Sequence, residues 1–158
     1  NCALYFSYNL AKENVIITSG LAKGIDSFSH IGTIQAKGKT IAVLGNGLDT
    51  IYPKENAKLA DKIIQNNGAI ISEYPLGTKP EKMNFPERNR IISGISKGII
   101  VIEAKKKSGT MLTVDFALEQ GKDIYAVPGN INSINSTGTN DLIKQGAKLV
   151  THFTEIEV

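Results

Sequence analysis

Arginine fills only two of the 18 basic positions in this 158-residue chain, and both lie in the hexapeptide Phe85-Pro86-Glu87-Arg88-Asn89-Arg90. Arginine clamps phosphates through two hydrogen bonds, stacks on bases and pairs with buried carboxylates, all of which lysine does less well. Lys79 and Lys82 come just before the hexapeptide, so positive charge and an aromatic ring occur together in one segment. Cationic side chains neutralise phosphates, and an aromatic ring gives an unpaired base a surface to stack on. The segment therefore predicts a site for a single-stranded nucleic acid.

A structural interpretation of the same hexapeptide remains open beside this one. Phe85 can anchor a long loop in the core, and one of the arginines can be buried in an ion pair. Arg88 and Arg90 are two residues apart, so on a helix they point to different faces. One of them can therefore bind a ligand while the other supports the fold.

The loop after the first apolar run is a candidate phosphate-binding loop. It reads Ser19-Gly20-Leu21-Ala22-Lys23-Gly24-Ile25-Asp26. Ser19 opens it, Gly20 and Gly24 let the backbone approach a ligand closely, and Lys23 adds a charge beside an expected helix N-terminus. A tight turn with Asp26 placed favourably near the helix start explains the same residues.

Two further loops are candidates for phosphate binding. Gly45 and Gly47 begin a pattern like that of dinucleotide-binding loops, but Thr50 stands at the third glycine position, so we do not expect a nicotinamide dinucleotide. Ser108, Gly109 and Thr110 follow a lysine run that starts at Lys105 and precede an expected helix. Such a loop can cradle a phosphate, although the spacing of a P-loop is absent and most of the lysines fit a solvated loop.

No catalytic or metal-binding constellation emerges from the sequence. Cys2 has no obvious activating neighbour, and His152 is expected to be exposed near the end of the chain. His30 follows Asp26 by four residues within a helix-like segment, which favours a structural histidine. We therefore expect no catalytic residue, no metal and no cofactor.

Short β-branched runs alternate with amphipathic stretches and predict the elements that must position these loops. We expect strands at 15–18, 40–44, 69–72, 98–102, 123–127 and 148–150. We expect helices at about 3–13, 25–37, 55–67, 87–96, 110–120 and 139–146, several of which would end in left-handed glycines at Gly38, Gly68, Gly121 and Gly146. The strands are continuously apolar, which predicts an α/β fold with a doubly wound, mostly parallel sheet and helices on both faces. Ligands of such sheets bind beyond the carboxyl ends of the strands.

Length and composition predict a single domain over residues 1–158. Hydrophobic residues make up 41% and charged residues 21% of the chain, its net charge is +3, and its pI is about 8.9. No apolar run reaches the ~20 residues of a membrane helix, and no signal-peptide pattern opens the chain. The chain starts almost directly in a helix-like segment, so we expect an earlier strand of the doubly wound sheet to be missing.

Seven motifs in order resemble those of the DNA-processing protein A family (DprA, also called Smf). They are 19–26, Gly47-Leu48-Asp49 with Tyr52-Pro53, 72–75, 85–94, Glu103-Ala104 with Ser108-Gly109-Thr110, Val127-Pro128-Gly129, and Gly138-Thr139-Asn140 with 142–143 and 146–147. The resemblance runs from about residue 15 to residue 150. It implies a Rossmann-like fold and a bacterial cytoplasmic protein of natural transformation, which binds incoming single-stranded DNA, forms homodimers and helps to load the RecA recombinase.

The resemblance also carries over site residues. It places DNA contacts at Lys82 and Phe85 and matches the family's R-N-R element to Arg88, Asn89 and Arg90. With the loop arguments above, Lys23 and Lys105 complete the expected DNA-binding set. The family's first-strand loop, which carries another DNA-contacting arginine, is absent here, and Lys23 stands where an arginine is commoner.

Two other functions are possible for such a fold beside non-catalytic DNA binding. A Rossmann-like enzyme that binds nucleotides or processes nucleoside monophosphates would carry a glycine-rich P-G-G-x-G-T motif followed by a catalytic glutamate. Here Pro128-Gly129 and Gly138-Thr139 are separated, and no such glutamate follows. A docking module for dimerisation and recombinase contact is compatible with DNA binding.

Overall fold

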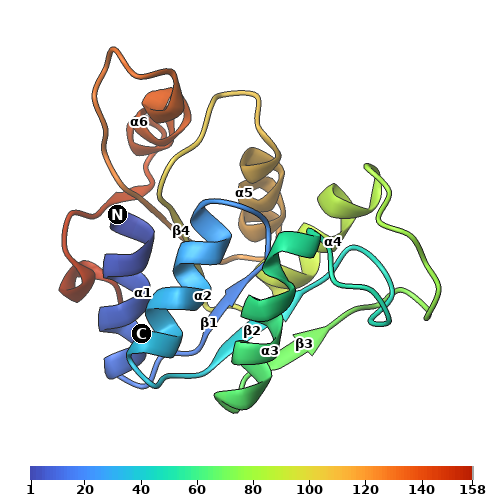
Figure 1. Ribbon diagram of the computed structural model, residues 1–158. Helices are drawn as coiled ribbons and strands as arrows, with labels where there is room; N and C mark the ends of the chain where they lie inside the picture. Colours follow the sequence, from blue (N-terminus) through green and yellow to red (C-terminus); the bar gives the residue numbers. More distant parts are fainter. Residues whose placement is uncertain (158) are drawn as a thin grey trace. The chain divides into compact units, whose positions relative to one another are not determined.

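The computed structural model describes residues 1–157, which divide into two compact units, Asn1–Arg88 and Asn89–Val158 (Figure 1). Each unit holds three parallel strands with helices between them. The expected α/β class and the parallel pairing of the strands are confirmed. The hydrogen-bonded ladders, however, form two three-stranded sheets, where the sequence predicted one. The single-domain organisation stays a prediction.

The first unit is a βαβαβ arrangement preceded by a helix. Its elements are α1 (Cys2–Lys12), β1 (Ile17–Ser19), α2 (Ile25–Gln35), β2 (Thr40–Val43), the 3-10 helix η1 (Lys54–Asn56), α3 (Ala57–Gln65) and β3 (Ala69–Ile71). The strand order is β1-β2-β3, and all pairs are parallel. Right-handed crossovers between sequential neighbours put α2 and α3 on the same face of this sheet. The three carboxyl ends therefore lie at one edge.

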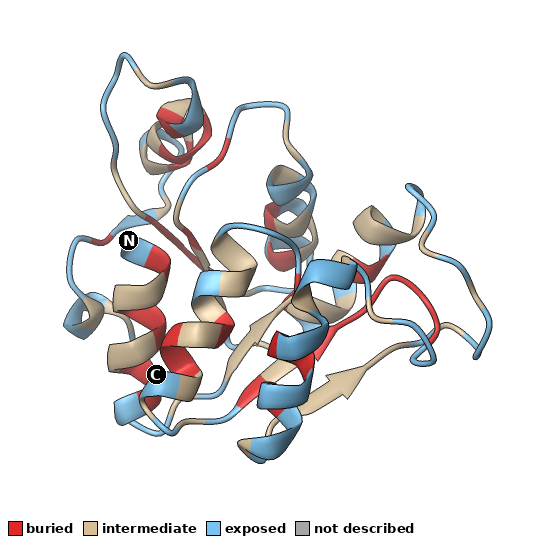
Figure 2. Ribbon diagram, in the orientation of Figure 1, coloured by how far each residue is buried: buried red, intermediate tan, exposed pale blue. Residues whose placement is uncertain are grey.

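The core of the first unit lies between its sheet and these two helices. Its fully buried members come from β2, α3 and the ends of β1 and β2, and they are Leu21, Ala42, Leu44, Leu59, Ala60 and Ile63. Figure 2 shows that burial continues from β2 into the turn that follows it, where residues 44–47 are all buried. α1 packs on α2 through Gly32, where a Cβ would lie 2.7 Å from the carbonyl oxygen of Leu4. This close packing explains why glycine stands in the middle of a helix.

The second unit repeats the alternation of strands and helices. Its elements are β4 (Gly98–Val101), α5 (Gly109–Glu119), β5 (Asp123–Ala126), the 3-10 helix η2 (Ile134–Ser136), α6 (Thr137–Lys144), β6 (Lys148–Leu149) and the 3-10 helix η3 (Phe153–Glu155). The strand order is β4-β5-β6, again parallel throughout. The core is built by Val101, Ala104, Val114, Ala117, Ile124, Ala126 and Leu142. The boundary between the units falls within α4 (Asn84–Gly94).

The ends of the helices correct two glycine assignments. Gly121 and Gly146 have positive φ angles of 68° and 105°, as expected for left-handed caps. Gly38 and Gly68 do not, because the left-handed residue is one position earlier, at Lys37 and Asn67, each with a φ of 58°. The amide of the next residue closes the turn in both cases, as in Gly38 N to Thr33 O at 2.9 Å and Gly68 N to Ile63 O at 2.9 Å. These glycines serve close packing instead: a Cβ on Gly38 would lie 2.6 Å from that of Ala11.

Two helices begin earlier than the sequence predicted. α4 begins at Asn84, three residues before the expected start, because a proline such as Pro86 fits in the first turn of a helix. The last helix was predicted at 139–146, but α6 begins two residues earlier, at Thr137, with Ser136 as its N-cap. Asn140 forms reciprocal hydrogen bonds with the backbone of Gly129, at 3.1 and 3.0 Å.

The histidines and the cysteine lie in structural or exposed positions. His30 is fully buried, and its Nδ1 lies 2.7 Å from Thr40 Oγ1. His152 and Cys2 are exposed. Within residues 1–157, no group of three or more His, Cys, Asp or Glu is placed to hold a metal ion. Over the same residues, no helix is long and apolar enough to cross a membrane.

Candidate nucleic-acid interface

Three loops follow β1, β2 and β3 at the carboxyl edge of the first sheet and are joined by hydrogen bonds. Asn84 Nδ2 donates to the carbonyl of Gly45 at 2.8 Å, which ties the start of α4 to the turn after β2. Ser72 Oγ donates to Asn46 O at 2.7 Å, and Gly47 N donates to Thr78 O at 3.0 Å. These bonds hold the loop of residues 72–83 against the loop after β2.

Arg88 is the buried arginine of the pair, with only 5% of its surface exposed. Its Nη1 donates to Gly20 O at 2.9 Å and also to Val43 O. The guanidinium thereby joins the carboxyl ends of β1 and β2 from the helix that follows β3. Burial lowers the pKa of the Arg88 guanidinium, and the negative charge of Asp26 opposes that shift. The group stays charged, because arginine is not deprotonated in proteins.

Gly20 has no side chain because the guanidinium of Arg88 occupies the space. A Cβ there would lie 2.7 Å from Arg88 Cζ. The amides of Gly20 and Ala22 both donate to Asp26 Oδ2, at 3.1 Å each. An internal carboxylate thus already pairs with two loop amides that could otherwise bind an anion. The phosphate role predicted for Ser19, Gly20 and Gly24 stays a prediction, and packing accounts for Gly20.

Phe85 lies across the turn after β2 in a partly buried position. A Cβ on Gly45 would meet its ring at 3.0 Å, so glycine is what allows the ring to lie on the backbone. The guanidinium carbon of Arg88 is 5.6 Å from the centroid of the Phe85 ring. The ring of Tyr52 is 5.6 Å from it between centroids, with an interplanar angle of 35°. These contacts show that Phe85 anchors the loops, and its role in binding DNA stays a prediction.

Gly47 is also explained by packing within the first unit. A Cβ there would lie 2.6 Å from the carbonyl oxygen of Pro75 and 2.6 Å from Asp49 Oδ1. That carboxylate in turn accepts a hydrogen bond from Gly77 N at 2.8 Å. The partial dinucleotide pattern of this loop thus has a structural basis.

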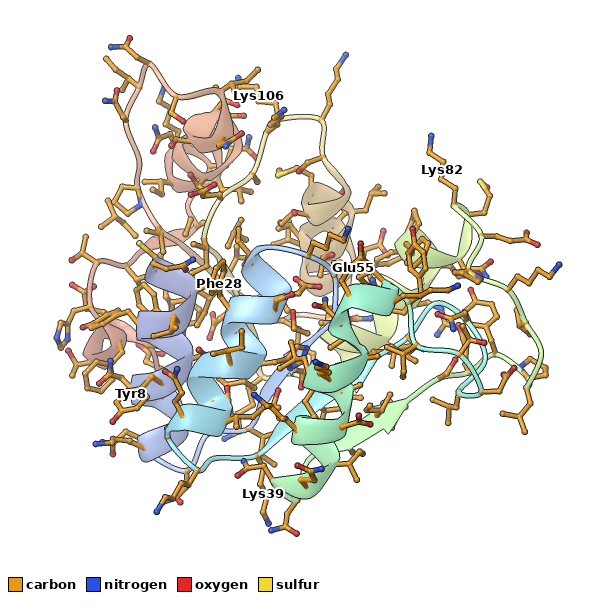
Figure 3. The ribbon with its side chains drawn as sticks, viewed as in Figure 1. Tyr8, Phe28, Lys39, Glu55, Lys82 and Lys106 are labelled. Atoms are coloured by element: carbon orange, nitrogen blue, oxygen red, sulfur yellow. The ribbon has the colours of Figure 1, made fainter. Side chains whose placement is uncertain are left out.

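Two of the predicted cationic residues in the first unit lie on the surface. Lys82 is exposed on the loop before α4 and extends away from the ribbon (Figure 3). Lys23 is exposed on the loop after β1, and its Nζ lies 2.5 Å from Oε1 of Glu55, which belongs to η1. Both side chains of that pair are 64% exposed, so water screens the attraction.

The remaining candidates belong to the second unit. Arg90 is exposed, and Asn89 Nδ2 donates to Gly109 O at 3.4 Å. Lys105 is exposed in the loop before α5. Ser108 precedes the first turn of α5, where Gly109 and Thr110 are exposed. The site roles of these residues stay predictions.

One residue of the first-unit edge, Tyr52, was not among the site residues predicted from the sequence. Its ring is 45% exposed and packs beside Phe85, although 33 positions separate the two in the sequence. An aromatic residue followed by proline in a polar loop was the available signal. Its partner could not be known without the pairing of the loops.

The parallel βαβ units and the loops collected at the carboxyl edge define this chain as a Rossmann-like α/β protein. The family described as DNA recombination-mediator protein A matches residues 1–157. The chain belongs to this family.

Relatives of known name support the same assignment. The chain is 52% identical over 151 residues to Protein Smf of Escherichia coli, covering 96% of this chain and 40% of that protein. The crystal structure of DNA processing protein A from Streptococcus pneumoniae is similar with a TM-score of 0.89 and 46% identity, covering 97% of this chain and 53% of that chain.

A third relative is the DNA processing protein A from Helicobacter pylori, solved to describe the single-stranded DNA binding mode of that protein. Its TM-score is 0.87 at 32% identity, covering 97% of this chain and 69% of that chain. The chain spans about 40 to 50% of the curated relatives named Smf and DprA from E. coli and S. pneumoniae.

Proposed function

We propose that this chain is a single-stranded DNA-binding part of a recombination mediator that acts without catalysis. Lys82 and Phe85 would contact the strand directly, and exposed Lys23, Arg90 and Lys105 would hold its phosphates. Asn89, from the same R-N-R element, would contribute a polar contact. Arg88 would act as a positioning residue, since its guanidinium is buried and bonded to backbone carbonyls.

One observation carries this proposal: an exposed lysine on the loop before α4 and a partly exposed aromatic ring in the first turn of α4 lie three residues apart, at the carboxyl edge of the sheet. Asn84 lies between Lys82 and Phe85, and its side chain bonds to Gly45, so the loop is anchored at that point. A fixed ring and a free cation are what binding of an unpaired strand requires. The DNA-binding mode described for the H. pylori relative supports the same class of ligand.

The resemblance to the family extends the proposal to partners. We infer that the complete protein forms homodimers, acts in the cytoplasm during natural transformation, and helps to load RecA onto the strand. Pull-down of RecA by variants that no longer bind DNA would separate the recombinase contact from the DNA contact.

Binding of labelled oligo-dT, measured by fluorescence anisotropy, tests the DNA site. We expect Lys82→Ala and Phe85→Ala each to weaken binding about tenfold, because base stacking is worth roughly 1–3 kcal/mol and a phosphate contact adds a salt-dependent term. A duplex of the same length should bind more weakly than the single strand.

Matched controls come from the same unit. Lys39 is exposed at the amino end of β2, so it lies at the opposite edge of the sheet from the loops, and Lys39→Ala should bind normally. Phe28, 39% exposed on α2, is the aromatic control. Unchanged affinity in both Lys82→Ala and Phe85→Ala would overturn the site assignment.

A further inference from the structure

The Tyr52 ring forms the more exposed half of an aromatic pair at the loop edge. Phe85 is flanked by the backbone of Gly45 and by the guanidinium of Arg88, and it is only partly exposed. Tyr52 is 45% exposed. Most of the ring surface that this pair offers to a ligand therefore belongs to Tyr52.

A pocket opens beside this ring within the first unit. It has a volume of about 330 Å³ and is lined by Ala22, Lys23, Tyr52 and Pro53. Sites for small ligands usually measure roughly 300–1,000 Å³, so the pocket suits a single nucleotide. Its lining combines an aromatic ring, a proline ring and one cationic side chain, which match the base and the phosphate of such a unit.

We propose that this pocket is a second nucleotide subsite, in which Tyr52 stacks on a base of the bound strand and Lys23 holds a phosphate. The inference rests on the proposed function and adds a residue to it. Tyr52 and Phe85 would receive neighbouring parts of the strand, because their ring centroids lie 5.6 Å apart and the rings are tilted by 35°.

Glu55 would compete with the strand for Lys23. The Lys23 ammonium lies 2.5 Å from the Glu55 carboxylate, and both groups are mostly exposed. A phosphate must take the place of that carboxylate, and Glu55 also repels it. Glu55 lies in η1, just before α3, on the same side of the unit as the loops (Figure 3). We therefore expect Glu55→Gln to strengthen the binding of oligo-dT severalfold.

Affinity for two strands of equal length and charge tests the stacking role. One is oligo-dT, and the other carries abasic residues throughout, so it keeps the phosphates and loses the bases. Tyr52→Ala should weaken oligo-dT binding about five- to tenfold and leave abasic binding within twofold of the unsubstituted chain. Tyr52→Phe keeps the ring and should bind oligo-dT normally. Leu48→Ala is the matched control, because Leu48 lies on the same loop with the same 45% exposure.

The outcomes separate this inference from the function on which it rests. If Lys82→Ala and Phe85→Ala weaken binding while Tyr52→Ala does not, the subsite is wrong and the proposed function stands. An equal loss on both strands for Tyr52→Ala would reveal a structural role and also overturn the subsite. If the unsubstituted chain binds neither strand, both proposals fall. Thermal unfolding of each variant shows that the fold is kept, and Tyr52→Phe tests the ring even if Tyr52→Ala unfolds.

Discussion

At the scale of single residues, the two arginines have different environments. Arg88 is 5% exposed and bonded to the carbonyl groups that end β1 and β2, whereas Arg90 is exposed. The sequence predicted that one would face a ligand and one would support the fold, because residues two apart on a helix point to different faces. It could not decide which, since the choice depends on carbonyl groups 45 and 68 positions away.

Arg88→Lys should destabilise the protein even though the charge is kept. An ammonium group on a narrower stem cannot fill the space above Gly20 and reach both carbonyls with the geometry of a guanidinium. A buried carbonyl left unpaired costs about 1–3 kcal/mol, so the free energy of unfolding should fall by about 2 kcal/mol. Urea unfolding measures it. Arg90→Lys is the control and should change stability by less than about 0.5 kcal/mol.

His30 should make stability depend on pH. Burial lowers the pKa of its imidazole from 6.5 to about 4, and the charge of Asp26 partly opposes this. The hydroxyl of Thr40 donates to Ile17 O at 2.6 Å, so it accepts from the Nδ1–H of a neutral ring. The unfolded chain binds a proton below pH 6.5 and the folded chain does not, so stability is lost as the pH falls from 6.5 toward 4.

The size of this effect follows from the shift in pKa. We expect a loss of about 2 kcal/mol between pH 7 and pH 4.5 beyond that of His30→Asn, which keeps a donor for Thr40 without titrating. Urea unfolding at both pH values measures the difference. The prediction is wrong if the two proteins lose stability in parallel.

At the scale of elements, the strands and helices could be read from the sequence nearly to the residue. Continuous apolar runs such as 98–102 occur where a strand is covered on both faces, and the observed β4 (Gly98–Val101) differs from that prediction by one residue. The starts of α4 and α6 were missed, because proline in a first turn and a competing loop contact are decided by local geometry. The contact between Tyr52 and Phe85 depends on how two loops pair, which no local pattern encodes.

Two neighbouring substitutions in the turn that ends α2 should change the stability of the protein in opposite directions. Lys37 has a φ of 58°, which costs an L-residue roughly 1 kcal/mol, so Lys37→Gly should be neutral or stabilising by about 0.5 kcal/mol. Gly38→Ala should destabilise by about 2 kcal/mol, because the added Cβ would lie 2.6 Å from that of Ala11. Thermal unfolding of both variants measures the two signs. A stabilised Gly38→Ala would contradict the packing argument.

At the scale of the whole molecule, the net charge is small and evenly divided. Residues 1–88 hold ten basic and eight acidic side chains, and residues 89–158 hold eight and seven. A diffuse field of this size attracts a polyanion only weakly. The proposed affinity for a strand would therefore have to come from a few exposed cations at defined positions.

The salt dependence of binding should reflect this small number. Lys23, Lys82, Arg90 and Lys105 are the exposed cations of the proposed site, and each phosphate contact with a single strand contributes a slope of about −0.7. The logarithm of the association constant should then fall with a slope of about −3 against the logarithm of salt concentration. Lys82→Ala should make the slope less negative by about 0.7, the contribution of one phosphate contact. A slope that this substitution leaves unchanged would exclude Lys82 from the phosphate contacts.

The carboxylate of Asp26, in the first turn of α2, acts as an internal anion for the loop after β1. It accepts hydrogen bonds from the amides of Gly20 and Ala22, so these two amides of the loop are paired without any ligand. The loop consequently has no need of a ligand to take its shape, and the proposed binding of a strand at this edge would involve little ordering of backbone. Because the loop is already ordered in the folded protein, it would lose little conformational entropy when a strand binds.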